Sequence, residues 1–156
     1  MRAHICAVGR LKSGPERALV DDYLARFDRT GRALGLGPAR VVEIDERKGG
    51  SRAAVAGLLR AAVPPGAVIL ALDERGKVLT SPEFADRIAA WRDGGARDLA
   101  LLIGGADGLA ADLTAEAHAV LSFGAMVWPH MLARVMVAEQ LYRAASILAG
   151  TPYHRV

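Results

Sequence analysis

Two short runs of uninterrupted apolar residues constrain the fold of this chain most. They are AVILAL at 67–72 and LALLI at 99–103, and neither alternates between apolar and polar positions. A strand with one face in water alternates, whereas a continuous apolar run of this length is typical of a strand covered on both faces. Such strands occur in parallel sheets, whose neighbouring strands are joined by helical crossovers. The two runs therefore predict an α/β protein.

The rest of the chain supplies further strands and the expected crossovers. We predict strands at 3–8, 40–44 and at the start of 120–128, where the last strand runs into an irregular loop. Helices are predicted after a serine cap at Ser13, over 53–63, after Ser81–Pro82–Glu83, weakly over 111–119, and over 130–148. We expect a single domain, 1–156, built on a mainly parallel sheet of about five strands.

Composition excludes several classes of protein. The chain has 156 residues, and 52% of them are hydrophobic, which excludes intrinsic disorder and fits one domain with a real core. Its single cysteine, Cys6, excludes a disulfide framework and a cysteine-rich zinc site, and we expect no metal. No apolar run approaches the roughly 20 residues of a membrane helix. The charges in MRAHICAVGRLK come too early for a signal peptide. We expect a cytoplasmic protein with no membrane partner.

The charge is distributed unevenly along the chain. Residues 1–60 carry 12 Lys and Arg against 7 Asp and Glu, whereas residues 61–156 carry 8 against 10. A basic half suits a polyanionic partner such as RNA, because each neutralised phosphate releases counterions. A merely solvated basic surface explains the same numbers equally well.

Three strand ends are candidates for a binding site, because ligands of parallel sheets bind beyond the carboxyl ends of the strands. They are Leu72–Asp73, the glycine turn at 104–108, and the segment 123–128. Gly104 and Gly105 would let the backbone approach a ligand closely, although a tight turn needs them too. The spacing Gly9-x4-Gly14 is followed by Pro15 and is not a Walker A loop. The glycine turn imitates only part of a dinucleotide fingerprint, so a nicotinamide cofactor is a weak alternative.

A few polar side chains lie near these strand ends or at the chain end. His130 follows Pro129 at a helix start, where it could cap the helix or meet a ligand. Arg134 and Arg143 lie on the same helix, and Arg143 could simply pair with Glu139 four residues earlier. The tail Tyr153, His154 and Arg155 offers the aromatic and cationic groups that hold RNA, unless it is a frayed end. His4 is expected to be structural and His118 to lie on a surface helix.

Five segments together resemble one family. They are HICAVGRLKSG at 4–14, LDERGK at 72–77, LLIGGADGL at 101–109, LSFGAMVWPHMLARVMVAEQLYRA at 121–144, and PYHR at 152–155. This set resembles the ribosomal RNA large subunit methyltransferase H family, bacterial SPOUT-class enzymes that methylate N3 of a pseudouridine in 23S rRNA. The resemblance spans the full length, but residues 31–62 match only loosely, and no site residue is inferred from them.

The resemblance implies an α/β-knot fold with a trefoil knot near the C-terminus, a homodimer whose active sites combine two subunits, and 23S rRNA of the assembled ribosome as substrate. It also implies that S-adenosylmethionine is held by the three strand ends, and the expected cofactor-binding residues are Leu72, Gly104, Gly105, Phe123, Gly124, Ala125, Met126, Val127 and Trp128. The tail would serve the substrate side. The candidate catalytic residues are Tyr153, His154, Arg155, Arg143, Arg134 and His130.

The implied chemistry is a direct displacement by N3 of the base. An arginine could stabilise the N3 anion, His154 is a candidate base, and Tyr153 a stacking partner. A non-catalytic RNA-binding or ribosome-associated module is the alternative, and it explains the basic half but not the glycine turn. We expect Gly104→Val to abolish cofactor binding and to leave the fold mostly intact. We also expect the apolar helix 130–148 to bury a second face against another subunit.

Overall fold

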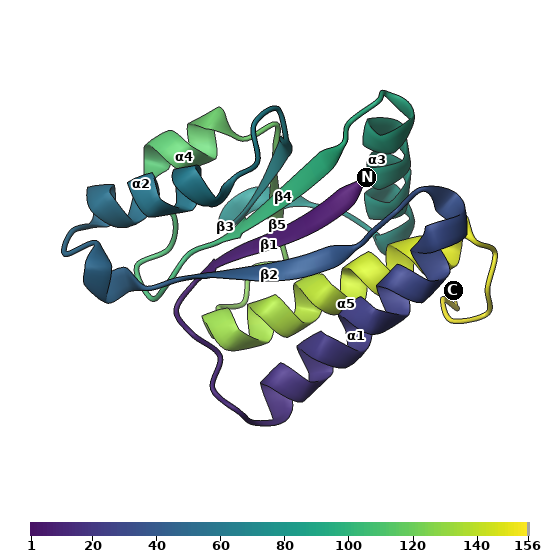
Figure 1. Ribbon diagram of the computed structural model, residues 1–156, viewed down its shortest axis with the longest axis horizontal. Coiled ribbons are helices and arrows are strands. Elements are labelled where there is room, and N and C mark those ends of the chain that lie inside the picture. The colour runs from purple at the N-terminus through teal and green to yellow at the C-terminus, as the bar shows by residue number, and fades with distance from the viewer. Residues whose placement is uncertain (156) are drawn as a thin grey trace.

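Five parallel strands form one sheet in the computed structural model, which describes residues 1–155, apart from the side chain of Lys48 (Figure 1). The sheet order is β2-β1-β4-β3-β5. The strands are β1 (Arg2–Val8), β2 (Ala39–Ile44), β3 (Val68–Val78), β4 (Asp98–Ile103) and β5 (Ala119–Ser122). The helices are α1 (Pro15–Gly31), α2 (Arg52–Ala62), α3 (Ser81–Asp93), α4 (Ala111–Glu116) and α5 (His130–Leu148), with short 3-10 turns η1 (Arg32–Leu34) and η2 (Glu46–Lys48).

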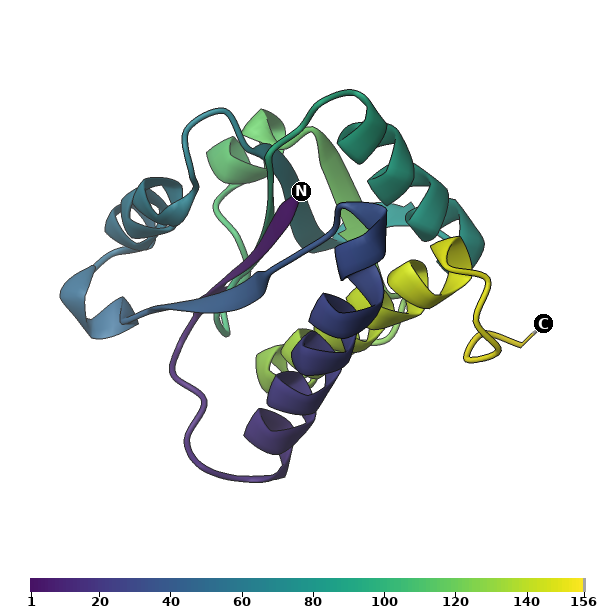
Figure 2. The same ribbon diagram turned by 45° about the vertical axis from the view of Figure 1, so that its right-hand side comes forward.

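Helices cover both faces of the sheet. Helices α1, α3 and α5 pack on one face, and α2 and α4 pack on the other (Figures 1 and 2). The central strand β4 is buried at every position, as its continuous apolar run predicts. The predicted α/β class, the parallel sheet and the number of strands are therefore confirmed. The trefoil knot stays a prediction.

Strand β3 is longer than its apolar run. The sequence analysis ended it at Leu72, but β3 continues through the charged residues Asp73–Lys77 to Val78. Its pairing with β5 shifts register between Leu72 and Lys77. A Cβ atom at Gly76 would lie 2.7 Å from the backbone carbon of Leu121. Only glycine therefore lets the arm of β3, residues 73–78, pass so close to β5. The apolar run ends at Leu72, where the arm leaves the core, but the pairing of β3 with β5 continues beyond that residue.

Three local predictions are wrong. Helix α1 has Gly14 as its N-cap with no side-chain cap, so Ser13 does not cap it. The N-cap of helix α3 is Thr80, one residue before the predicted Ser81–Pro82–Glu83, and Thr80 forms a reciprocal capping box with Glu83. His118 is exposed but follows α4, and its Nδ1 accepts a hydrogen bond from the backbone N–H of Ile69. The other predicted helices and strands are present, with ends shifted by at most three residues, and the helix 130–148 has the predicted bounds.

A chain of polar contacts, centred on buried His4 and Asp98, joins the amino ends of β1, β2 and β4. The ring of His4 contacts Asp98 through Nε2 at 2.6 Å and accepts a hydrogen bond from Arg40 Nε at 2.8 Å. Arg2 pairs with both oxygens of Asp98. These hydrogen bonds hold the pKa of Asp98 down at about 2. His4 therefore has a structural place, on the edge of the sheet opposite the candidate site. Among the described residues, no helix is long and apolar enough to cross a membrane.

Candidate functional site

A cavity of about 350 Å³ lies beyond the carboxyl ends of β3, β4 and β5. The three segments singled out from the sequence converge on it from separate parts of the chain. Eight of the nine expected cofactor-binding residues line it: Leu72, Gly104, Gly105, Phe123, Gly124, Met126, Val127 and Trp128. Ala125 is exposed and outside the lining. The strand-end argument thus identified one shared cavity.

Several lining residues were missed by the sequence analysis. They are Arg52, Glu74, Arg75, Ile103, Leu109, Leu121 and Ala133, whereas the lining residues Ala106, Asp107 and Gly108 belong to the glycine turn already singled out. Most of them neighbour the expected segments and could have been found by extending those segments. Arg52 could not, because it comes from the start of α2, within a region that matches the resembled family only loosely. Its guanidinium donates a hydrogen bond to the carbonyl of Leu109 at 2.7 Å and so ties α2 to the glycine turn.

The glycine turn is built by close backbone contact. A Cβ atom at Gly104 would lie 2.4 Å from the backbone carbon of Gly108. The N–H of Gly108 donates to the carbonyl of Gly105 at 3.0 Å, which closes the turn. Any side chain at position 104 therefore forces the turn itself to move. The expectation that Gly104→Val leaves the fold mostly intact is wrong at this turn, because the clash is with backbone and not with a ligand.

Strand β3 presents a fixed carboxylate at the cavity just after Leu72, where the apolar run ends. Asp73 accepts hydrogen bonds from both the backbone N–H and the Nε of Arg75, at 3.0 and 2.9 Å. The Arg75 side chain holds the pKa of Asp73 below its ordinary value, although partial burial acts in the other direction. Asp73 is therefore an ionised acceptor of fixed orientation at neutral pH.

The loop between β5 and α5 carries apolar side chains that are unusually exposed. Gly124 has a φ of +104°, and its N–H donates to Ser122 Oγ at 3.1 Å, so this part of the loop is ordered by the end of β5. Met126 and Val127 are 73% and 85% exposed. Trp128, Met131 and Leu132 extend the same apolar surface onto α5. A contiguous apolar patch beside a cavity is typical of a protein interface.

His130 lies at the wall of the cavity. It is the first residue of α5, and its ring reaches the β1–α1 loop, where a Cβ atom at Gly9 would lie 3.8 Å from His130 Nε2. Of the six candidate catalytic residues, it is the one that lines this cavity.

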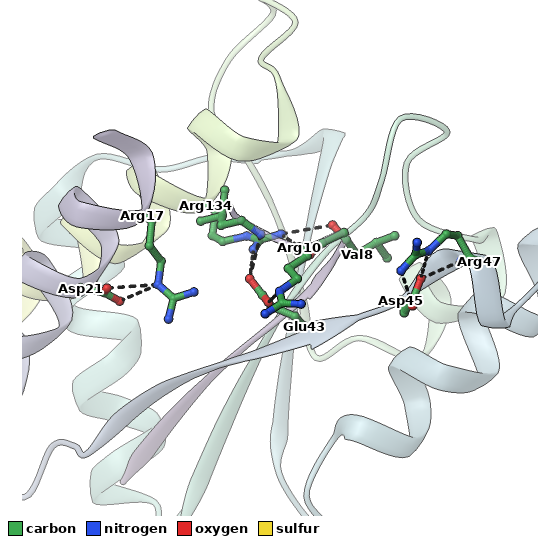
Figure 3. A network of polar contacts seen from close by, with 10 residues as sticks. Val8, Arg10, Arg17, Asp21, Glu43, Asp45, Arg47 and Arg134 are labelled. Atoms are coloured by element: carbon green, nitrogen blue, oxygen red, sulfur yellow. Dashed lines mark hydrogen bonds and ion pairs between the residues drawn. The ribbon is translucent and has the colours of Figure 1, made fainter. Parts of the chain in front are cut away.

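Arg134 is buried one turn further along α5. Its side chain is 1% exposed and pairs with Glu43 at 3.2 Å. Its other nitrogen donates to the backbone carbonyls of Val8 and Gly9, at 3.2 and 3.0 Å (Figure 3). Burial lowers the pKa of this guanidinium, and Glu43 acts against that shift. In this arrangement Arg134 joins α5 to the ends of β1 and β2, and it has no open path to a substrate.

The remaining candidates form a cluster at the other end of α5. Arg143 pairs with Glu139 at 3.0 Å through Nε, and Glu139 also accepts a hydrogen bond from the Tyr153 hydroxyl at 2.9 Å. Burial first, and then Glu139, raise the pKa of Tyr153. The Tyr153 ring packs against Tyr142 with ring centroids 4.4 Å apart. This tail is docked against α5, so a frayed end is excluded for Tyr153.

His154 belongs to the same cluster, and Arg155 lies at its edge. His154 Nδ1 is 3.3 Å from a nitrogen of Arg143, whereas its Nε2 is buried without a hydrogen-bond partner among residues 1–155. Arg155 is exposed. Because Glu139 and Arg143 lie nine and 13 residues after His130 on α5, at about 1.5 Å per residue, the cluster lies roughly 14–20 Å along the helix from His130 at the cavity wall. Figures 1 and 2 show the tail at the far end of α5. The two groups of candidates do not meet within one chain.

Comparisons with known proteins match the whole chain. The family model described as "Predicted SPOUT methyltransferase" matches residues 1–154. A ribosomal RNA large subunit methyltransferase H from Dinoroseobacter shibae is 72% identical over 156 residues, with complete coverage of both chains. One from Ruegeria pomeroyi is 69% identical over the same length, again with complete coverage. The solved structure of a probable methylase family protein from Haemophilus influenzae shares the fold, with a TM-score of 0.53 at 14% identity, covering 99% of this chain and 70% of that one.

Proposed function

The chain belongs to the SPOUT methyltransferase family, and within it to the ribosomal RNA large subunit methyltransferases H, so we propose that it methylates N3 of a pseudouridine in 23S rRNA of the assembled ribosome. S-adenosylmethionine is the methyl donor of this family. Methylation of large-subunit rRNA follows from membership of this family. The target base, its N3 atom, the assembled ribosome and a cytoplasmic location are the proposal.

The cavity at the ends of β3, β4 and β5 fits the cofactor. Its volume of about 350 Å³ lies within the range of small-molecule sites, roughly 300–1,000 Å³. Gly104 and Gly124 bring backbone to its surface, while Leu72 and Phe123 supply an apolar wall. These residues would hold an adenosine moiety between apolar side chains and backbone hydrogen-bonding groups. When bound there, S-adenosylmethionine supplies an electrophilic methyl group on its sulfonium.

The tail cluster supplies the groups that a target base needs. Tyr153 offers an aromatic ring for stacking, and Arg155 a guanidinium for a phosphate or for an N3 anion. His154 is the candidate base, because its buried Nε2 lacks a partner that a substrate proton donor would provide. Arg143 orients His154 and Tyr153. Positioning of reactants contributes up to roughly 7–11 kcal/mol in favourable cases.

A dimer reconciles the distance between cavity and tail. We propose that the apolar patch of Met126, Val127, Trp128, Met131 and Leu132 packs against a second copy of this chain, in a closed two-fold arrangement. In such a dimer the tail of one subunit can meet the cavity of its partner. Each active site would then combine the cofactor residues of one chain with the substrate residues of the other.

The observation that carries the proposal is the convergence of three distant segments on one cavity in a chain of this family. A non-catalytic RNA-binding module would use the basic first half, but it needs neither the backbone cradle at Gly104 nor the docked tail. The cavity and the tail together therefore favour an enzyme.

Mass spectrometry of rRNA tests the proposal. A strain with the gene deleted should lose one methyl group from a pseudouridine of 23S rRNA, and the wild-type gene should restore it. An unchanged nucleoside composition in the deletion strain would contradict the proposal. A methyl group lost from another nucleotide would keep the rRNA methyltransferase activity and overturn the pseudouridine target.

A further inference from the structure

A second and larger cavity lies next to the first. This groove, of about 1060 Å³, runs between the β1–α1 loop, the start of α1 and the end of β2. Its lining is Gly9, Arg10, Leu11, Lys12, Ser13, Gly14, Arg17, Ala18, Asp21, Glu43, Ile44, Asp45, Glu46 and Arg47. The proposed cofactor and tail residues do not account for it. All of its lining comes from the basic first half of the chain.

Most of the acidic groups in the groove are compensated by neighbouring arginines. Arg17 pairs with Asp21 at 3.1 Å, and Arg47 pairs with Asp45 at 2.9 Å. Figure 3 shows these pairs at opposite sides of the groove, with Arg10 between them. The remaining acid, Glu46, extends toward the glycine turn, where a Cβ at Gly105 would lie 3.3 Å from its carboxylate. The middle of the groove is therefore free of uncompensated negative charge.

The carboxylate of Glu43, which lines the groove, already accepts hydrogen bonds from other residues of the protein. It accepts hydrogen bonds from buried Arg134 at 3.2 Å and from the backbone N–H of Leu11 at 2.9 Å. Arg10 approaches Glu43 only to 4.0 Å, and its side chain is 88% exposed. Lys12 is also exposed and has no ion pair among the described residues. Two cations of the β1–α1 loop are thus available to an anionic ligand.

The groove adjoins the proposed cofactor cavity. Gly9 lines the groove, His130 lines the cavity, and the ring of His130 reaches the backbone of Gly9. Arg134 fixes this junction, because it holds the carbonyls of Val8 and Gly9 to α5. An extended ligand bound in the groove would therefore continue into the cavity along this fixed junction.

We propose that this groove binds the ribose-phosphate backbone of the RNA substrate, with Arg10 and Lys12 as the phosphate-contacting groups. The inference rests on the proposed function and assigns it an RNA surface outside the cofactor cavity and the tail. Phosphate contacts position a nucleic acid without reading its sequence. Arg10 and Lys12 therefore set affinity and register for the RNA, while the reacting groups lie elsewhere.

A double variant, Arg10→Ala with Lys12→Ala, tests the groove. The matched control is Arg29→Ala with Arg32→Ala, which removes the same charge from exposed positions at the other end of α1 and in η1, outside the groove. The substrate is ribosomes from a strain lacking this enzyme, at fixed magnesium and 50–200 mM monovalent salt. Steady-state kinetics gives kcat and the KM for ribosomes, calorimetry gives the affinity for S-adenosylmethionine, and thermal unfolding reports the fold.

The groove double variant should raise the KM for ribosomes by about tenfold. The slope of log KM against log salt concentration should fall by about two, one for each lost phosphate contact. Its kcat, cofactor affinity and unfolding temperature should stay at the wild-type values, and the control should match wild type throughout. A wild-type KM and salt slope in the groove variant, or equal losses in the control, would overturn the proposal. If the wild-type protein methylates no rRNA, the proposed function fails, and the groove is judged by the same difference in salt slope for binding isolated 23S rRNA.

Discussion

At the scale of single residues, the site depends on backbone that only glycine permits. Gly104 is the clearest case, because the atom that a Cβ would strike is the backbone of Gly108. The sequence showed that glycines gather after β4, but the pattern could not distinguish a ligand contact from a turn contact. The structure shows the turn contact directly, and both Gly104 and Gly108 also line the cavity.

Gly104→Ala should therefore weaken both the turn and the cofactor site. We expect S-adenosylmethionine affinity to fall at least about tenfold, and the unfolding temperature to fall with it, since the added methyl group displaces backbone. Calorimetry and thermal unfolding measure the two effects. The matched control is Gly57→Ala in α2, where nothing lies within 4 Å of the new Cβ. That variant should keep cofactor affinity and gain about 0.5–1 kcal/mol of stability. Unchanged cofactor affinity in Gly104→Ala would contradict the site assignment.

Asp98 links stability to pH through a depressed pKa. Its hydrogen bond to Arg2, above all, holds the pKa of the carboxyl at about 2 in the folded chain, below its ordinary value of 3.8. Its contribution is complete above the unfolded value and is lost as the pH falls through 2. Urea unfolding should show wild type more stable than Asp98→Asn at pH 7, with the difference shrinking between pH 4 and pH 2. A difference that stays constant down to pH 2 would show that the charge of Asp98 is not responsible.

At the scale of helices and strands, α5 separates the two halves of the proposed chemistry. Its first turn borders the cofactor cavity, and its last turns hold the docked tail through Glu139, Arg143 and Tyr142. Arg134 anchors the first half of α5 to β1 and β2. One helix thus carries the loop proposed to hold the cofactor at one end and the tail proposed to hold the substrate on its second half.

Deletion of residues 152–156 should separate these roles. Cofactor affinity and the dimer should stay nearly unchanged, because the cluster lies roughly 14–20 Å along α5 from His130 at the cavity of its own chain. Methylation of ribosomes should fall at least ~10²-fold, the lower range for a lost catalytic group. Calorimetry, light scattering and a methyl-transfer assay measure these three quantities. If the deletion variant methylates ribosomes at the normal rate, the tail has no catalytic role. If the variant loses cofactor binding, the tail belongs to the cofactor site instead.

The sequence predicted these elements well where apolar periodicity is strong. The runs at 67–72 and 99–103 and the long helix 130–148 were located nearly to the residue, because burial on both faces leaves a direct pattern. The arm of β3 beyond Leu72 was missed, since its hydrogen bonds to β5 need no apolar residues. The burial of Arg134 was missed for a related reason, because Glu43 lies 91 residues away in sequence. Long-range polar pairs of this kind leave no local signal.

At the scale of the whole molecule, the proposed active site needs a second copy of the chain. The apolar patch around Met126 and Leu132 has no cover in one chain, and the cavity and the tail face different ends of α5. Membership of the family implied a dimer, but it did not indicate which residues would meet. The exposed side chains at the start of α5 give that implication a location. The sequence predicted that α5 buries a second apolar face against another subunit. We now place that proposed contact at the first turn of α5 and the preceding loop.

Leu132→Glu should dissociate the dimer, because it places a charge in the proposed apolar interface. We expect light scattering at micromolar concentration to report a monomer, with methylation lost. Leu19→Glu is the matched control, since Leu19 on α1 is 44% exposed, close to the 40% of Leu132, and lies outside the patch. That variant should remain a dimer with wild-type activity. A dimeric Leu132→Glu protein would place the interface elsewhere.

Mixing two inactive variants tests the central claim most directly, that each active site takes its cavity from one chain and its tail from the other. Gly104→Val, which is expected to abolish cofactor binding, and the 152–156 deletion would be combined, allowed to exchange subunits, and incubated with ribosomes that lack the modification. Nucleoside mass spectrometry would then measure N3-methylpseudouridine in 23S rRNA. Random exchange leaves one intact site in each mixed dimer, so we predict about a quarter of the wild-type rate, with almost none from either variant alone. No product above that of the separate variants would contradict the account.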